Sequence, residues 1–482
     1  GRLSEVQQAQ ITNILTDYTR LIHKCRPEAL KPETYHALNY REGSRVLAEA
    51  GQVMQAAQKL YDELERVAPE MIPAYVSLVW YPAMGTMNVL KLNVLSGMNH
   101  YLAQLGALSA NDYAKEAAEC LRADHRIIEQ YHRADDARWY GMGLSQHIGF
   151  VNWNEDECKN PLLMQVLPLQ KQAVIATVDG TMQHVEGSPW LNQRMTIPDF
   201  LNPECRCASI SLYSRSELPA SFRVIEKPEW ILLSAMDGTL DGEDHKRFTI
   251  EVNVDERALA LALTDGKTQG MIRLKLPAGN CEISVPVDRT AYVYENNTFV
   301  DTQGWIAIEA EHYSVCRDGF DRDGHPMQWK CLAGYGKTLS AMKAFPTDSY
   351  ADAENGAPYI EYSIVTKQAG DYDAEFYMQP SNPVTTENRL QYAVSVNGVQ
   401  MQILDAVTDN FKIGDHQLVW ARGVLDQIRR QSVPVQLKQG INTIRVYPVT
   451  PGFVLEKIVI YPQGNKPAEA YLGPTETYRC RS

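Results

Sequence analysis

Hydrophobic residues recur every three or four positions through the first 160 residues, which is the spacing of amphipathic helices. The clearest stretch, residues 46–64, keeps this spacing for about five turns. Ser4 and Gln7 have the form of a capping box and predict the start of an earlier helix. Prolines interrupt the uncharged segment 71–90, so we expect a broken, buried segment there. The pattern predicts a bundle of about five helices over residues 1–160.

After Pro161 the pattern changes to short runs in which apolar and polar residues alternate, as in half-buried strands. The clearest of these runs are residues 248–254, 282–287, 359–365, 444–447 and 455–461. Turn signals separate the runs, at Asp237-Gly238, Asp265-Gly266, Asp323-Gly324 and Asn397-Gly398. No helical period alternates with the strands, so the sequence holds no (β/α)₈ barrel, which needs about 250 residues of alternating units.

The β region is too long for one small sandwich, and a new block of strands begins near Asp301. The predicted fold class is therefore a multidomain chain, α then β, with an N-terminal helical bundle followed by two β-sandwich domains. The expected boundaries are a bundle at 1–160, a linker and Ig-like sandwich at 161–300, a jelly-roll sandwich at 301–465 and a tail at 466–482.

Charge and composition exclude several classes of partner. The 482 residues include 46 Lys and Arg against 59 Asp and Glu, a net charge of −13, which argues against nucleic acid and anionic membranes. Segment 71–90 is the best candidate for a membrane span, and Pro73 and Pro82 argue against it. The nine cysteines form no Cys-x-x-Cys pair, which favours buried thiols over a zinc site. The chain opens Gly-Arg-Leu with no apolar signal region, which suggests a processed or excised piece whose compartment the N-terminus does not reveal.

The segment 137–153 concentrates the side chains that sugar sites use. Aromatic rings stack on the C–H faces of sugars, while amides and an imidazole bind the hydroxyl groups. The candidate substrate-binding residues are Trp139, Gln146, His147, Asn152 and Trp153. The alternative is a corner between a helix and a loop in which these aromatics are simply buried.

The block from Trp305 to Tyr461 resembles the jelly-roll sandwich of carbohydrate-binding modules, in which a paired-glutamate first strand recurs. In some relatives that pair holds a structural calcium ion, which here would involve Glu309 and Glu311 with Glu456. A pair of exposed strand carboxylates is the competing interpretation. The aromatic residues that would bind carbohydrate in this block are Trp329, Tyr335 and Trp420. No other cofactor is expected.

Two smaller motifs are better explained without ligands. Asp318, Asp321 and Asp323 resemble half of a calcium loop, but the terminal bidentate acid is missing, which favours an acidic turn. Lys337 lies in a glycine-rich stretch that resembles the end of a phosphate loop. That loop needs a glycine where this chain has Cys331, so we expect no nucleotide site.

Five segments occur in the same order in glycoside hydrolase family 115, the xylan α-glucuronidases, which the chain therefore resembles. They are residues 24–30 (Lys-Cys-Arg-Pro-Glu-Ala-Leu), 78–82 (Leu-Val-Trp-Tyr-Pro), 146–153 (Gln-His-Ile-Gly-Phe-Val-Asn-Trp), 451–460 (Pro-Gly-Phe-Val-Leu-Glu-Lys-Ile-Val-Ile) and 470–476 (Ala-Tyr-Leu-Gly-Pro-Thr-Glu). Family members carry their catalytic carboxylates on a (β/α)₈ barrel that precedes the bundle and the sandwiches. This sequence resembles only the bundle and sandwich portion, so no catalytic residue is assigned.

The resemblance implies the C-terminal part of an enzyme that removes glucuronic or 4-O-methylglucuronic acid side chains from glucuronoxylan. The chain would then supply a cleft wall, packing or oligomerisation, and alone it would be inactive. The implied partner is a plant cell-wall polysaccharide, with a homodimer and a structural calcium ion also allowed. The implied location is secreted, periplasmic or at the cell surface. The alternatives are a stand-alone carbohydrate-binding or scaffold protein, and a structural protein that binds no sugar.

Overall fold

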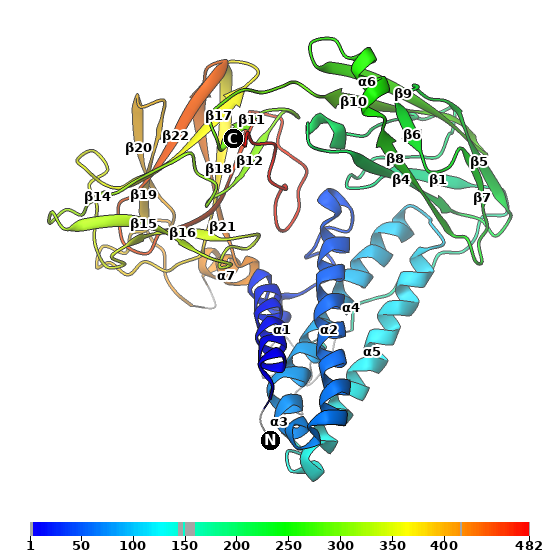
Figure 1. Ribbon diagram of the computed structural model, residues 1–482, viewed down its shortest axis with the longest axis horizontal. Helices are drawn as coiled ribbons and strands as arrows, with labels where there is room; N and C mark the ends of the chain where they lie inside the picture. Colours follow the sequence, from blue (N-terminus) through cyan, green and yellow to red (C-terminus); the bar gives the residue numbers. More distant parts are fainter. Residues whose placement is uncertain (1–2, 143–147, 150–159, 415–416, 482) are drawn as a thin grey trace. The chain divides into compact units, whose positions relative to one another are not determined.

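Helices come first along the chain and mostly antiparallel sheets follow, in the order that the hydrophobic pattern predicts (Figure 1). A computed structural model describes residues 3–142, 148–149, 160–414 and 417–481. The chain forms two compact units. Unit 1 contains residues 1–197, 206–262 and 269–286, and unit 2 contains residues 198–205, 263–268 and 287–482. The helices and the first pair of sheets therefore share one unit, and the second sandwich forms the other.

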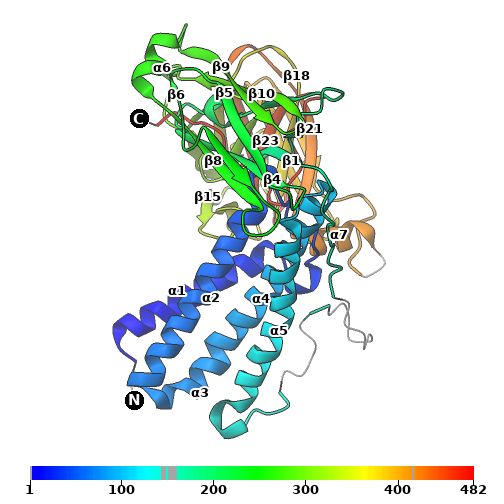
Figure 2. The ribbon, with the colours of Figure 1, turned by 90° about the vertical axis from the view of Figure 1, so that its right-hand side faces the viewer.

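Four long helices build the bundle of unit 1 and lie side by side in Figure 2, with α4 packed against α2 and α5 and with α1 packed against α2. The α-helices are α1 (Glu5–Lys24), α2 (Glu42–Val67), α3 (Ile72–Tyr75), α4 (Tyr81–Gln104) and α5 (Ala110–Arg133). Short 3₁₀ turns cover Pro27–Ala29, Asn39–Arg41, Pro69–Met71 and Ala134–Ala137, and a π-helical turn covers Val76–Trp80. The break predicted at 71–90 is wrong, because α3, the π turn and α4 follow one another with helical backbone angles and without a gap, so the prolines do not end the helix.

The capping box is confirmed: Ser4 Oγ accepts from the Gln7 backbone N–H, and Gln7 Oε1 accepts from the Ser4 N–H. Helix α4 is apolar on every side because it is the central helix of the bundle. Its buried polar groups are satisfied internally; the Asn88 amide, for example, donates to the Cys120 carbonyl at 2.8 Å.

Two asparagines of the bundle hold the segment that leads into the first sandwich. Residues 160–173 run without helix or strand, and Asn99 makes paired hydrogen bonds with the backbone N–H and C=O of Met164. Asn111 binds the backbone of Val166 in the same way. Each side-chain amide thus replaces the backbone partner that an extended segment would find in a sheet.

Gly97 in α4 is where the chain comes closest to this helix. A Cβ at that position would lie 2.2 Å from the backbone oxygen of Pro32, whereas a Cβ at Gly51 in α2 would meet nothing within 4 Å. We expect Gly97→Ala to lower the free energy of unfolding by about 3 kcal/mol, because neither backbone can move aside easily. Gly51→Ala should raise it by about 0.5–1 kcal/mol through the gain in helix propensity. Urea denaturation followed by circular dichroism measures both, and equal effects would contradict the packing described.

The first sandwich pairs two five-stranded sheets, with strand orders β2-β1-β4-β8-β6 and β3-β10-β9-β5-β7. The strands are β1 (Val174–Val178), β2 (His184–Val185), β3 (Arg194–Thr196), β4 (Cys207–Ser214), β5 (Ala220–Glu226), β6 (Ile231–Leu233), β7 (Asp237–Leu240), β8 (Arg247–Val254), β9 (Lys267–Leu276) and β10 (Gly279–Asp288), with a short helix α6 (Glu256–Ala262) before β9. The alternating runs at 248–254 and 282–287 are confirmed as β8 and β10.

The turn predicted at Asp237-Gly238 is wrong, because both residues lie inside β7. A Cβ on Gly238 would lie 2.6 Å from the Phe222 ring, so the glycine makes room for an aromatic side chain on the neighbouring strand. The turn at Asn397-Gly398 is confirmed, with both residues at positive φ, and so is the turn at Asp265-Gly266.

The second sandwich also consists of two sheets, with orders β11-β17-β22-β19-β20 and β14-β15-β16-β23-β18-β21; β13 pairs with β17, and β12 with β23. The strands are β11 (Thr298–Val300), β12 (Ile306–Glu309), β13 (Val315–Arg317), β14 (Gly319–Phe320), β15 (Pro326–Leu332), β16 (Ala341–Phe345), β17 (Tyr359–Thr366), β18 (Gly370–Met378), β19 (Gln391–Val396), β20 (Gln400–Asp405), β21 (Arg429–Leu437), β22 (Gly440–Pro448) and β23 (Val454–Pro462), with helix α7 (Leu418–Asp426) before β21. Its core is aromatic: Tyr392 and Phe453 stack with centroids 4.5 Å apart. The fold class, a helical bundle followed by two β-sandwiches, is confirmed.

The described residues show neither a disulfide nor a helix that could span a membrane. Eight cysteines are free thiols, and burial raises the pKa of Cys120 to about 11 and that of Cys281 to about 12, which keeps both unreactive at neutral pH. None of the helices that the structure describes combines the length and apolar character needed to cross a bilayer.

Candidate functional site

Only the start of the predicted sugar segment can be placed. Trp139 follows the 3₁₀ turn after α5 with 41% of its surface exposed, and the neighbouring Tyr140 is exposed as well. Gln146, His147, Asn152 and Trp153 lie outside the described residues. An exposed indole is available for stacking, and Trp139 therefore stays a candidate for sugar binding.

The three aromatic candidates of the second sandwich lie in different environments. Trp329 is only 5% exposed, its Nε1 donates to the Pro358 carbonyl, and its ring meets the Phe453 ring edge-on. A buried ring offers no face to a sugar, so Trp329 is a core residue. Tyr335 is exposed, and Trp420 on α7 is half-buried against the core.

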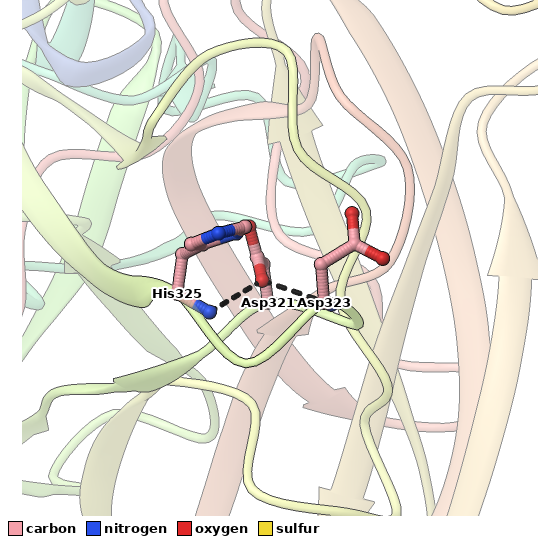
Figure 3. Close-up of side chains that lie close together, drawn as sticks. All are labelled: Asp321, Asp323 and His325. Carbon is pink, nitrogen blue, oxygen red and sulfur yellow. Dashed lines mark hydrogen bonds and ion pairs between the residues drawn. The ribbon is translucent and has the colours of Figure 1, made fainter.

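The acidic turn predicted at residues 318–324 is the arrangement shown in Figure 3. Asp321 Oδ1 accepts from the backbone N–H groups of Asp323 and His325, at 3.0 and 2.8 Å. These bonds, the His325 N–H first, hold the pKa of Asp321 below its ordinary value. Ligand atoms of Asp321, Asp323 and His325 lie within 4.8 Å of one another, but hydrogen bonding within the turn already explains that geometry.

A second group of acids is buried inside the second sandwich, beneath the loop that joins β15 and β16. Glu309 ends β12 and lies directly opposite Lys457 on β23, which places their side chains on the same face. Glu309 Oε1 is 3.1 Å from Lys457 Nζ, and Glu309 Oε2 accepts from the Thr338 hydroxyl at 2.6 Å. Both carboxylate oxygens of Glu309 are thus paired.

The Lys457 ammonium is saturated with acceptors. It is 2% exposed, and besides Glu309 it donates to the backbone carbonyls of Leu472 and Pro474 at 3.2 and 3.0 Å. Three donors therefore meet three acceptors, which is what a buried ammonium needs to remain charged. The C-terminal segment that supplies the two carbonyls is held on the sandwich by this contact.

Glu456 is the most perturbed acid of the group. It is 1% exposed, and its Oε2 accepts from the Lys337 backbone N–H at 2.6 Å. Burial raises the pKa of Glu456 to about 7, against the lowering effect of the Lys337 contact and with a further rise caused by Glu309. Its other oxygen, Oε1, is buried without a hydrogen-bond partner among the described residues.

Glu311 is in a similar position two residues beyond Glu309. Both of its oxygens are buried and lack a hydrogen-bond partner in the part of the chain that the structure describes. Burial raises the pKa of Glu311, and the neighbouring Glu309 raises it further. The interpretation of Glu309 and Glu311 as exposed strand carboxylates is therefore wrong.

The chemistry of the three glutamates fits a calcium ion only in part. Calcium binds carboxylate oxygens, and three buried oxygens, two from Glu311 and one from Glu456, have no other partner. Glu309 does not fit, because Lys457 and Thr338 already occupy its oxygens. In the described part of the chain Glu309, Glu311 and Glu456 do not all bring ligand atoms within 4.8 Å of one another, and only Glu311 and Glu456 of the three have oxygens left for a cation.

Sequence reasoning identified the glutamates and missed the lysines. Lys457 follows Glu456 within an alternating strand pattern, where a lysine is normally a solvated residue. Lys337 was considered only as part of a phosphate loop. Its ammonium instead donates to the Asp426 carbonyl and lies 3.3 Å from the centre of the Tyr471 ring. Neither partner is close in sequence, so no local signal could have revealed these contacts.

Comparison with known proteins gives a family match for the second sandwich. Residues 298–476 match the family model of the glycosyl hydrolase family 115 C-terminal domain, which confirms the resemblance over that stretch. The matched region includes the three glutamates and both lysines. No curated protein matches the chain.

Solved structures show weaker likenesses. A family GH115 4-O-methyl-α-glucuronidase with specificity for decorated arabinogalactans aligns with a TM-score of 0.47 and 10% identity, over 95% of this chain and 39% of its own. A family 35 carbohydrate-binding module from Clostridium thermocellum aligns with a TM-score of 0.21 and 20% identity, over 32% of this chain and 97% of its own. A Podospora anserina GH26-CBM35 β-(1,4)-mannanase aligns with 0.22 and 14%, over 34% and 29%. The chain thus spans 39% of the length of the GH115 structure.

Proposed function

We propose that this chain is the C-terminal, supporting portion of a glycoside hydrolase that removes glucuronic or 4-O-methylglucuronic acid side chains from glucuronoxylan. The observation that carries the proposal is the match of residues 298–476 to the GH115 C-terminal domain. The bundle supplies a wall of the catalytic cleft, beginning at Trp139, and the sandwiches pack the enzyme together or join two copies. The substrate is a cell-wall polysaccharide, and the protein works in a secreted, periplasmic or cell-surface location.

The buried acids are consistent with a supporting role. A glycosidase needs an acid and a second carboxylate about 5–9.5 Å apart on either side of an accessible sugar. Glu309 and Glu456 are instead enclosed and bonded to Lys457 and to the Lys337 backbone. These two acids therefore serve the fold of the sandwich, which supports the proposal that the catalytic carboxylates lie on an upstream barrel.

The gene tests this proposal directly. We expect the reading frame to continue several hundred codons upstream of Arg2 and to encode alternating β and α units, because a family 115 barrel precedes the bundle. A start codon immediately before Arg2 would contradict the proposal and leave a stand-alone protein.

The second candidate function is a free-standing carbohydrate-binding or scaffold protein. The observation that favours it is the exposure of Tyr335 on the second sandwich. Affinity electrophoresis in glucuronoxylan measures this function, with Tyr335→Ala as the variant. Unretarded migration of the unaltered chain would remove the second candidate and leave the first intact.

We further propose that Glu311 and Glu456 supply carboxylate oxygens to a calcium ion. Their three unpartnered buried oxygens support it, and the role of the ion would be structural, since the site is closed. Urea denaturation at pH 8 with and without calcium ions tests this proposal.

A further inference from the structure

A pocket of about 580 Å³ opens at one end of the bundle, where α3 and the C-terminal end of α5 lie together in Figures 1 and 2. Its volume lies within the range of about 300–1,000 Å³ that is usual for small-molecule sites. All of its lining residues belong to unit 1 and to the described part of the chain. Its lining contains none of the candidate sugar, calcium or nucleotide residues of the sequence analysis and none of the buried acids of the second sandwich.

The backbone around the pocket is unusual in two places. Asp135, Asp136 and Ala137 have φ angles of 53°, 53° and 61°, a left-handed conformation that side-chain-bearing residues rarely adopt. On the opposite wall, Val76 opens the π-helical turn that precedes α4. Both kinds of irregularity are costly and concentrate at binding sites.

The two walls of the pocket differ in chemistry. One wall is apolar and aromatic, with Tyr61, Ile72 and Pro73. The other is polar and consists of the last turns of α5 and the turn after it, with Arg126 and with Gln130, which is hydrogen-bonded to the Tyr61 hydroxyl of the first wall. A ring with an apolar face and a hydroxylated edge matches such a pair of walls, because C–H groups pack on the aromatic side while hydroxyls meet amides and charges.

The charges of the polar wall favour a neutral ligand. Two arginines face three carboxylates in the lining, and Arg133 contacts Glu129 while Arg126 contacts Glu119 at 2.5 Å. An anionic ligand would find both arginines already paired with glutamates, and the negative charge of Asp136 would repel it. Hydroxyl groups, which both donate and accept, can bind carboxylates and guanidinium groups at once.

We propose that this pocket binds a neutral sugar unit of the polysaccharide backbone. This inference rests on the proposed function and extends it: besides the catalytic cleft, the protein has a second site, which binds the main chain of the polysaccharide. Beyond the pocket the aromatic row continues: the His132 and Tyr140 rings lie 5.2 Å apart, His132 Nδ1 accepts from the Gly141 N–H, and Trp139 follows the same turn. A second sugar unit extending from the pocket would reach the exposed Tyr140 and Trp139, whereas His132 is buried and only supports the Tyr140 ring.

Two arginines of α5 provide a matched test. Arg122 and Arg126 both contact Glu119 and are about equally exposed, but only Arg126 lines the pocket. Calorimetric titration of the chain with xylohexaose should show Arg126→Ala weakening binding by about five- to ten-fold, the effect of losing one hydrogen bond of ordinary strength. Arg122→Ala should bind as the unaltered chain does. Arg133→Ala, a second pocket variant, should weaken binding to a similar extent.

Three outcomes would overturn the proposal: no binding of xylohexaose at millimolar concentration, equal binding by all variants, or tighter binding of glucuronic acid than of xylohexaose. Unchanged melting temperatures of the arginine variants show that binding, not folding, is measured. A longer polypeptide that hydrolyses glucuronoxylan while its bundle binds no xylohexaose would remove the pocket proposal alone. An inactive longer polypeptide with a functioning pocket would remove the hydrolase proposal alone.

Discussion

Replacing Lys457 with methionine is expected to lower the free energy of unfolding of unit 2 by about 3–5 kcal/mol. The variant leaves the Glu309 carboxylate buried with one oxygen unpaired, and it leaves the Leu472 and Pro474 carbonyls without their donor. A buried charge that loses its partner costs more than the pair itself contributes, since the desolvation of the remaining ion is no longer compensated. The C-terminal segment should detach early in unfolding.

Urea denaturation followed by near-ultraviolet circular dichroism measures this loss. Lys438→Met is the matched control, because Lys438 is an exposed lysine of the same sandwich and its replacement should change stability by less than about 0.5 kcal/mol. Adding Glu309→Gln to Lys457→Met should recover part of the stability, because no unpaired charge remains buried. A loss below about 1 kcal/mol for Lys457→Met alone would contradict the buried ion pair.

The stability of unit 2 is expected to fall as pH rises from about 4.5 to about 7. Burial raises the folded-state pKa of Glu456 to about 7, above its ordinary 4.5, so in this window the folded state binds more protons than the unfolded state. The stabilisation is fully present below pH 4.5 and lost as pH rises through 7, for a total of about 3 kcal/mol. Glu456→Gln stays neutral and should remove this part of the slope.

Urea midpoints at pH 5 and pH 8 measure the slope, with the exposed Glu354→Gln as the control that should retain it. Calcium ions at pH 8 should stabilise the unaltered chain, because Glu311 and Glu456 would then have a cationic partner. Glu456→Gln should respond much less to calcium. Parallel pH profiles for Glu456→Gln and the unaltered chain would contradict the assignment of the slope to this residue. If calcium has no effect on stability, the proposed calcium ion is ruled out.

The elements of the fold follow from periodicity because each helix or strand buries one face locally. Within β17, the alternate apolar residues of the pattern are Ile360, Tyr362 and Ile364, and all three enter the core of the second sandwich. The π turn at Val76–Trp80 was not predicted, because its hydrophobic pattern does not differ from that of a helix. Asp237-Gly238 was misread because a glycine that makes room for Phe222 resembles a glycine that makes a turn.

The candidate sites could be predicted only as far as their residues are neighbours in sequence. Glu309 and Glu311 were recognised from their spacing in one predicted strand, although β12 ends at Glu309, whereas the role of Lys457 depends on carbonyls about fifteen residues further along, which return to cover it. A helical bundle over residues 1–160 was predicted, but the pocket depends on where α3 and the turn before it meet the end of α5. Contacts of this kind are set by the way the chain folds back, and no local pattern encodes them.

The release of 4-O-methylglucuronic acid from glucuronoxylan oligosaccharides tests the central claim most directly. We predict that overnight digestion with this chain alone releases no more acid than a blank without protein, because the proposal assigns the catalytic acid and nucleophile to an upstream barrel. The longer polypeptide with its upstream codons should release the acid. Release by the chain alone would contradict the account, since catalysis would then need no barrel.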